Sequence, residues 1–115
     1  MNVIIFGPPG AGKGTQAQSI AKKFNLYQIS TGDMLRNEIK INTDLGKKID
    51  QVISKGGLAG DDIVNELLIK LIKNPKYRNR MIFDGYPRNL SQAESLEFML
   101  NSDNQSINFI LFLKV

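Results

Sequence analysis

The sequence predicts an α/β protein, built as a doubly wound parallel sheet with helices on both faces. An unbroken apolar run at residues 3–6 suits a strand that is covered on both faces, and a glycine-rich turn with a lysine follows it directly. Further apolar runs at 81–83 and 107–115 alternate with segments of helical periodicity. Because the run at 107–115 is apolar nearly throughout, we expect it to form an interior strand.

The turn after the first strand reads GPPGAGKGT at residues 7–15. Its glycines allow backbone conformations that a Cβ atom forbids, so successive N–H groups can converge on one anion. The helix expected to begin near Lys13 adds the positive end of its dipole, and Lys13 adds a full charge. We interpret the turn as a phosphate-binding loop of the P-loop class, although Gly14 stands where that motif has Ser or Thr and Thr15 follows one place later. The alternative is a glycine-rich strand-to-helix turn that binds nothing.

The helix after this loop has one apolar face, formed by Ala17, Ile20, Ala21 and Phe24. Asn25 is expected to cap its C-terminus, and residues 26–29 are typical of a short second strand. Ser30, followed three places later by Asp33, predicts the start of another helix.

The remaining helices interrupt the alternation and then restore it. A helical stripe at 45–53 stops at Gly56, and the next stripe ends before Pro75, so three helices follow one another without a strand. The simplest account is a small helical insertion over the sheet edge near residues 30–59. After the next strand, the capping box SQAE at 91–94 opens a helix whose predicted buried side is Leu96, Met99 and Leu100.

The polar turn DGYPR at residues 84–88 leaves the strand at 81–83. Parallel sheets bind ligands at the carboxyl ends of their strands, so this turn should face the phosphate loop. Asp84 has the position from which a Walker-B aspartate reaches nucleotide-bound magnesium, and Thr15 could supply a companion hydroxyl. The alternative for Asp84 is a turn residue beside a glycine.

Two arginines, Arg36 and Arg88, are predicted to reach the same edge of the sheet. Either could clamp a second phosphate through paired N–H donors. The alternative for each is a solvated surface residue, and Asp33 is equally well explained as a carboxylate at a helix N-terminus.

Composition excludes several kinds of chemistry and of partner. The 115 residues contain neither Cys nor His, which excludes disulfides, thiolate nucleophiles, histidine bases and Cys/His zinc sites. The net charge of +4 comes without a block of five or six like charges, so small polyanionic ligands explain it and we expect no nucleic-acid partner. We find no apolar run that could span a bilayer and no secretory signal, and we expect a cytoplasmic protein without a membrane partner.

Three motifs resemble the adenylate kinases, a family of P-loop nucleoside monophosphate kinases. They are GPPGAGKGTQ at 7–16, STGDMLR at 30–36 and DGYPRNLSQA at 84–93, in the family's order and separations over the whole chain. The resemblance implies a P-loop NTPase fold and reversible, Mg²⁺-dependent phosphoryl transfer from ATP to AMP, giving two ADP. It also implies a kinase core over residues 1–115 in which 30–59 is the insertion that binds nucleoside monophosphate (NMP).

The resemblance also carries expectations about completeness. The sheet of the family continues beyond the position of Val115, and its ATP lid, further arginines and last strand would follow there. We therefore expect a chain that is incomplete at its C-terminus and poorly active by itself. Separately, we expect a monomer.

The resemblance implies roles for individual residues. The expected ATP-binding residues are Gly10, Ala11, Gly12, Lys13, Gly14 and Thr15. The expected AMP-binding residues are Thr31, Arg36, Gly57, Leu58, Ala59, Gly85, Tyr86, Pro87, Arg88 and Gln92. Catalytic roles are implied for Lys13, Asp84, Arg88 and Arg36, and contact with magnesium, partly through water, for Thr15 and Asp84.

The sequence also leaves room for functions different from that of an adenylate kinase. Asn89 resembles the UMP/CMP kinase form of the turn, whereas Thr31 and Gln92 resemble the adenine-reading pair of adenylate kinases, and the last two would contact the base. The chain could also be a different small P-loop kinase, a truncated nucleotide-binding module without turnover, or a nucleic-acid-binding protein.

Overall fold

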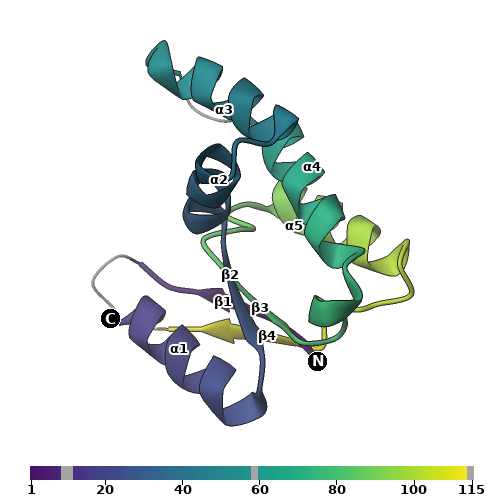
Figure 1. Cartoon of the computed structure of the whole chain (residues 1–115). Helices are drawn as coiled ribbons and strands as arrows, with labels where there is room; N and C mark the ends of the chain where they lie inside the picture. Colours follow the sequence, from purple (N-terminus) through teal and green to yellow (C-terminus); the bar gives the residue numbers. More distant parts are fainter. Residues whose placement is uncertain (9–11, 58–59, 114–115) are drawn as a thin grey trace.

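A four-stranded parallel sheet forms the centre of the computed structural model, which describes residues 1–8, 12–57 and 60–113 (Figure 1). Its strands are β1 (Asn2–Phe6), β2 (Tyr27–Ser30), β3 (Met81–Asp84) and β4 (Phe109–Phe112). The strand order is β2-β3-β1-β4, and each neighbouring pair is parallel. This arrangement confirms the predicted α/β class, and the second strand begins one residue later than expected.

Helices cover both faces of this sheet, as a doubly wound fold requires. They are α1 (Lys13–Phe24), α2 (Thr31–Lys40), α3 (Asp44–Ser54), α4 (Asp61–Ile72), the short 3₁₀ helix η1 (Pro75–Tyr77) and α5 (Leu90–Asn101). Because side chains alternate along a strand, Val3 and Ile5 pack toward Ala17 of α1, whereas Ile4 packs on the other face with Leu68 and Leu96 of α4 and α5. Strands β1 and β3 are therefore buried between two helical layers, and the polar turn at residues 84–88 begins where β3 ends.

The predicted cap of α1 is confirmed, whereas the predicted N-cap of α5 is wrong. Asn25 caps α1 with a left-handed φ of 57°, as predicted. At α5 the capping side chain belongs to Asn89, whose Oδ1 accepts from the backbone N–H of Gln92 at 2.9 Å, and not to Ser91. The helix thus begins one residue before the expected capping box. Phe24, predicted on the apolar face of α1, is 51% exposed.

Strand β4, predicted to be interior, lies at one edge of the sheet in the described part of the chain. It pairs with β1 on one side, and within the described part of the chain no strand pairs with its other side. Phe109 and Phe112 are 56% and 72% exposed, although the Phe112 ring stacks on Phe6 at a centroid distance of 5.3 Å. An apolar strand pattern reports what a strand can bury, but the strand's place in the sheet decides how much of it is covered.

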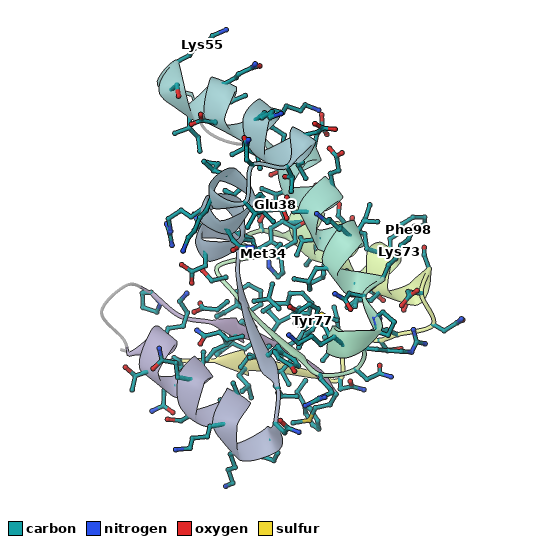
Figure 2. All side chains as sticks on the ribbon, viewed as in Figure 1. Met34, Glu38, Lys55, Lys73, Tyr77 and Phe98 are labelled. Atoms are coloured by element: carbon teal, nitrogen blue, oxygen red, sulfur yellow. The ribbon has the colours of Figure 1, made fainter. Side chains whose placement is uncertain are left out.

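Helices α2 and α3 form a helical arm that extends away from the sheet (Figure 1). An apolar cluster of its own joins the arm to α4, with Ile49 of α3 packed against Ile63 and Leu67. Figure 2 places Glu38 where α2 approaches α4; its buried carboxylate accepts from Thr43 Oγ1 at 2.6 Å and from Lys70 Nζ at 3.3 Å. The arm lies within residues 30–59, and its role as an NMP-binding insertion stays a prediction.

Gly46 allows α2 and α3 to pack closely against each other within the arm. A Cβ atom at this position would lie 2.1 Å from the backbone oxygen of Glu38, closer than real side-chain contacts allow. We expect Gly46→Ala to lower the free energy of unfolding by about 1–3 kcal/mol, since the helices would have to move apart. Urea denaturation measures this, with Gly60→Ala as the control because a Cβ at Gly60 meets no atom of the described residues within 4 Å. Equal effects of the two substitutions would contradict the packing argument.

Candidate active site

Lys13 enters the site from the first turn of α1. The preceding Gly12 has a φ of 76°, which glycine adopts without strain, and its carbonyl accepts from the N–H of Gln16 at 2.9 Å to start the helix. Lys13 then reaches across the carboxyl end of the sheet and forms a hydrogen-bonded ion pair with Oδ1 of Asp84. The lysine of the predicted phosphate loop and the predicted Walker-B aspartate are therefore in direct contact.

Asp84 is the last residue of β3 and is only 9% exposed. Its second carboxylate oxygen, Oδ2, accepts from Nε2 of Gln28 at 3.2 Å. Gln28 and Ser30 lie on the same face of β2, and Ser30 is paired in register with Asp84. The Asp84 carboxylate is thus held by one residue of the neighbouring strand β2 and one residue of α1. The sequence analysis did not identify Gln28 as a site residue. The feature that could have indicated it is a polar residue within a short strand predicted to be otherwise apolar.

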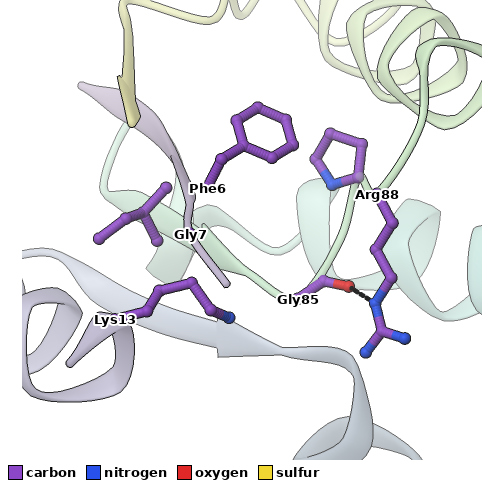
Figure 3. A pocket seen from close by; sticks show the side chains of 7 residues that line it. Phe6, Gly7, Lys13, Gly85 and Arg88 are labelled. Atoms are coloured by element: carbon purple, nitrogen blue, oxygen red, sulfur yellow. Dashed lines mark hydrogen bonds between the residues drawn. The ribbon is translucent and has the colours of Figure 1, made fainter. Parts of the chain in front are cut away.

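A cavity of about 490 Å³ opens beside this pair (Figure 3). Its lining consists of Ile5, Phe6, Gly7, Lys13, Gly85, Pro87 and Arg88. The two cationic side chains approach from different sides, Lys13 from α1 and Arg88 from the turn after β3. A cavity with two cationic groups and a largely apolar wall suits an anionic ligand that also presents an apolar part.

Arg88 is oriented by its own turn. Its Nε donates to the carbonyl oxygen of Gly85 at 2.7 Å, so this hydrogen bond leaves the two Nη groups available to other acceptors (Figure 3). Gly85 has a φ of 86°, and a Cβ there would lie 3.8 Å from Arg88 Nη2 and 3.9 Å from Thr31 Oγ1. Thr31, at the start of α2, therefore lies close to the same turn.

Arg36, Tyr86 and Gln92, three further residues of the site prediction, are not among the residues that line this cavity. Arg36 forms an ion pair with Asp33, and both side chains are more than 70% exposed. Tyr86 points into the core, where its hydroxyl donates to Asn65 Oδ1 at 2.7 Å. Gln92 lies beside Arg88, from whose backbone N–H its Oε1 accepts at 2.7 Å. Three more predicted site residues are exposed in the structure: Gly14, Thr15 and Gly57. The other four lie outside the described residues: Gly10, Ala11, Leu58 and Ala59.

The oxygen ligands offered to a metal here are few and hard. Among residues 1–8, 12–57 and 60–113, no group of three or more His, Cys, Asp or Glu side chains is placed to hold an ion. Asp84 contributes a carboxylate, and Thr15 contributes a hydroxyl on the first turn of α1. This set fits Mg²⁺, which binds through one or two protein oxygens while phosphate groups and waters supply the rest. It lacks the histidine and cysteine ligands on which protein zinc sites are mainly built, since the sequence contains neither residue.

The buried phenol of Tyr86, in the turn after β3, is expected to make the stability of the folded chain depend on pH. Burial, and to a lesser degree the charge of Asp61, raise the pKa of Tyr86 above its ordinary value of 10.0. Between pH 10 and this raised pKa the folded state keeps a proton that the unfolded state loses, so the tyrosine's contribution to stability falls as the pH rises. We expect urea midpoints to fall less between pH 8 and pH 11 for Tyr86→Phe than for the unmodified chain. Tyr77→Phe is the control, and an alkaline loss reduced equally by both would contradict this account.

No helix in the described part of the chain has the length and apolar character needed to cross a membrane.

Comparison with known proteins identifies relatives along the whole chain. A family model described as "Adenylate kinase" matches residues 5–115. The adenylate kinase of Pelagibacter ubique is 59% identical over 115 residues, which are 100% of this chain and 54% of the relative. The adenylate kinase of Mycoplasma mycoides is 44% identical over 100% of this chain and 53% of its own length, and that of Trichomonas vaginalis is 46% identical over 98% and 49%. The chain spans about half the length of the curated relatives it matches.

Proposed function

This chain belongs to the adenylate kinase family, and we propose that its protein catalyses reversible, Mg²⁺-dependent phosphoryl transfer from ATP to AMP, giving two ADP and so balancing adenine nucleotides. The observation that carries the proposal is the cavity that Lys13 and Arg88 enter from different elements beside the buried Asp84. Phosphoryl transfer needs positioned positive charge more than a strong base, so a chain without histidine is sufficient for it.

Lys13 and the start of α1 form the proposed ATP side of the site. The helix N-terminus and the ammonium group together favour phosphate oxygens, and Lys13 would leave Asp84 to reach the transferred group. Gly10, Ala11, Gly12, Gly14 and Thr15 are proposed to complete the loop around the ATP phosphates. Their place next to Lys13 in the sequence supports this assignment.

Arg88, Gly85 and Thr31 form the proposed AMP side. The guanidinium Nη groups that do not bind Gly85 can donate in parallel to two oxygens of one phosphate. We propose that Arg36, Gly57, Leu58, Ala59, Tyr86, Pro87 and Gln92 belong to the same subsite. Arg36 would have to leave Asp33 and approach the cavity with the arm, and such closure also excludes water from the transfer.

Asp84 and Thr15 are proposed to hold Mg²⁺, Asp84 through the ion's waters. When bound, Mg²⁺ would supply positive charge to the phosphate oxygens. Gln28 would keep Asp84 oriented after Lys13 has moved to the phosphate, because its hydrogen bond to Oδ2 does not involve the lysine. We further propose a monomeric, cytoplasmic protein.

A coupled assay with ATP, AMP and Mg²⁺ tests this function. Since the relatives are about twice as long as this chain, the assay is run on the chain itself and on a chimera in which it replaces the matching 115 residues of the Pelagibacter ubique adenylate kinase. We expect the chimera to phosphorylate AMP. We expect the chain alone to bind AMP but to transfer phosphate to it only slowly. Equal rates for the chain and the chimera would contradict the second expectation. A preference of the chimera for UMP, CMP, GMP or shikimate over AMP would instead favour another small kinase.

A further inference from the structure

The side-chain amide of Gln92 is held at both of its ends. Its Oε1 accepts from the backbone N–H of Arg88 at 2.7 Å, and its Nε2 donates to Oδ1 of Asp61, the first residue of α4, at 3.0 Å. The backbone of Gln92 is fixed as well, since its N–H donates to Asn89 Oδ1 at 2.9 Å. The contact between Gln92 and Asp61 therefore joins α5 to α4 next to the turn that carries Arg88.

These partners determine which way the amide faces. A backbone N–H can only donate, and an ionised carboxylate can only accept. The oxygen of Gln92 must therefore face Arg88, and the nitrogen must face Asp61. Each end keeps one further capacity, a lone pair on Oε1 and an N–H on Nε2.

We propose that Asp61 is a positioning residue that sets the base specificity of the AMP subsite by fixing the orientation of Gln92. The inference rests on the proposed function, in which Gln92 belongs to that subsite. Adenine presents a donor, the 6-amino group, beside an acceptor, N1, and a fixed amide oxygen and N–H complement this pair. A 6-oxo purine has acceptor and donor exchanged at these positions, so it could pair only with a reversed amide. Reversal would place the amide NH₂ against the N–H of Arg88 and the oxygen against Asp61.

Two features of the helix start support Asp61 as the residue responsible. Asp61 and Asp62 both lie in the first turn of α4 and both interact favourably with its N-terminus. Of these two aspartates, Asp61 is the one that accepts a hydrogen bond from Gln92, and its charge also reaches Tyr86, where it raises the phenol's pKa. The two aspartates therefore share a local role at the helix and differ in their contact with the turn.

The test compares AMP with inosine monophosphate (IMP), its 6-oxo analogue. Dissociation constants for both nucleotides, and for ATP, are measured with the 115-residue chain and with the chimera described above. We expect the unmodified proteins to prefer AMP, and Asp61→Ala to reduce the AMP-to-IMP preference about three- to tenfold, the range expected for one solvent-accessible hydrogen bond. ATP affinity should stay unchanged. Asp62→Ala should leave the preference as it was, and Asp61→Asn, which keeps an acceptor oxygen, should restore part of it.

A second measurement separates failure of this inference from failure of the proposed function. In ligand-free chain, the two side-chain N–H signals of Gln92 in a ¹⁵N–¹H spectrum should shift and exchange faster in Asp61→Ala than in Asp62→Ala. If the unmodified chimera neither binds nor phosphorylates AMP, the proposed function is wrong, and these signals still decide whether Asp61 fixes the amide. If AMP is preferred but Asp61→Ala and Asp62→Ala have the same preference, or if the Gln92 signals do not respond, the positioning role is overturned.

Discussion

Replacing Lys13 by glutamine should lower the rate of phosphoryl transfer by the chimera about 10²- to 10³-fold, the usual effect of removing one group that stabilises transition-state charge. Lys13 is the cationic side chain that joins the cavity to Asp84, and glutamine keeps a polar group of similar length without the charge. The loss should appear in kcat more than in the KM for AMP, because the charge acts on the transferred group. Steady-state kinetics at saturating and limiting AMP measure both.

Lys22→Gln is the matched control for this substitution. Lys22 is an exposed residue in the last turn of the same helix, so its replacement removes a charge from α1 without changing the cavity. Circular dichroism of Lys13→Gln should also be recorded, because within the described residues the buried Asp84 would then keep one of its two side-chain partners, Gln28. A folded Lys13→Gln variant with the turnover of Lys22→Gln would contradict the proposed role of the loop.

Replacing Arg88 by lysine should weaken AMP binding about 10- to 100-fold while ATP binding stays within a factor of two. A hydrogen bond to a charged group contributes roughly 1.5–3 kcal/mol, and each 1.4 kcal/mol corresponds to a tenfold change in affinity. Lysine keeps the charge but has a single ammonium group in place of the planar fork that lets Arg88 bind Gly85 through Nε and present two Nη groups in parallel to one phosphate. Isothermal titration of the chain with each nucleotide measures the two affinities separately.

Arg78→Lys provides the comparison for Arg88. Arg78 is an exposed arginine that donates to Asp103 at 2.7 Å, and it does not line the cavity beside Lys13. A module that binds only ATP should keep its affinity in both variants and bind no AMP in either. Loss of ATP affinity in Arg88→Lys would place both phosphate subsites on one arginine and contradict their proposed separation.

Much of this site follows from local sequence. The strand at the N-terminus, the loop before Lys13 and the turn from Asp84 to Arg88 each contain their own signals, and parallel strands bring their carboxyl ends to one edge. The contact between Lys13 and Asp84 could be expected on this basis. The partner of Arg36 could not be expected, because helical periodicity places this residue on α2 but does not decide whether its side chain binds Asp33 or reaches the cavity.

The sequence by itself determined the α/β class, the strand-to-helix loop with its lysine, and the polar turn that faces it, since each depends on residues close together in the chain. Tertiary structure alone decided that β4 lies at the edge of the described sheet, that Gln28 holds Asp84, that Tyr86 points into the core, and that Asp61 holds Gln92. The hydrogen bonds of Gln28 with Asp84, of Tyr86 with Asn65 and of Gln92 with Asp61 join residues between 21 and 56 positions apart in the sequence. Such pairs form only when strand order and helix packing bring them within hydrogen-bond distance, and neither is encoded in a local pattern.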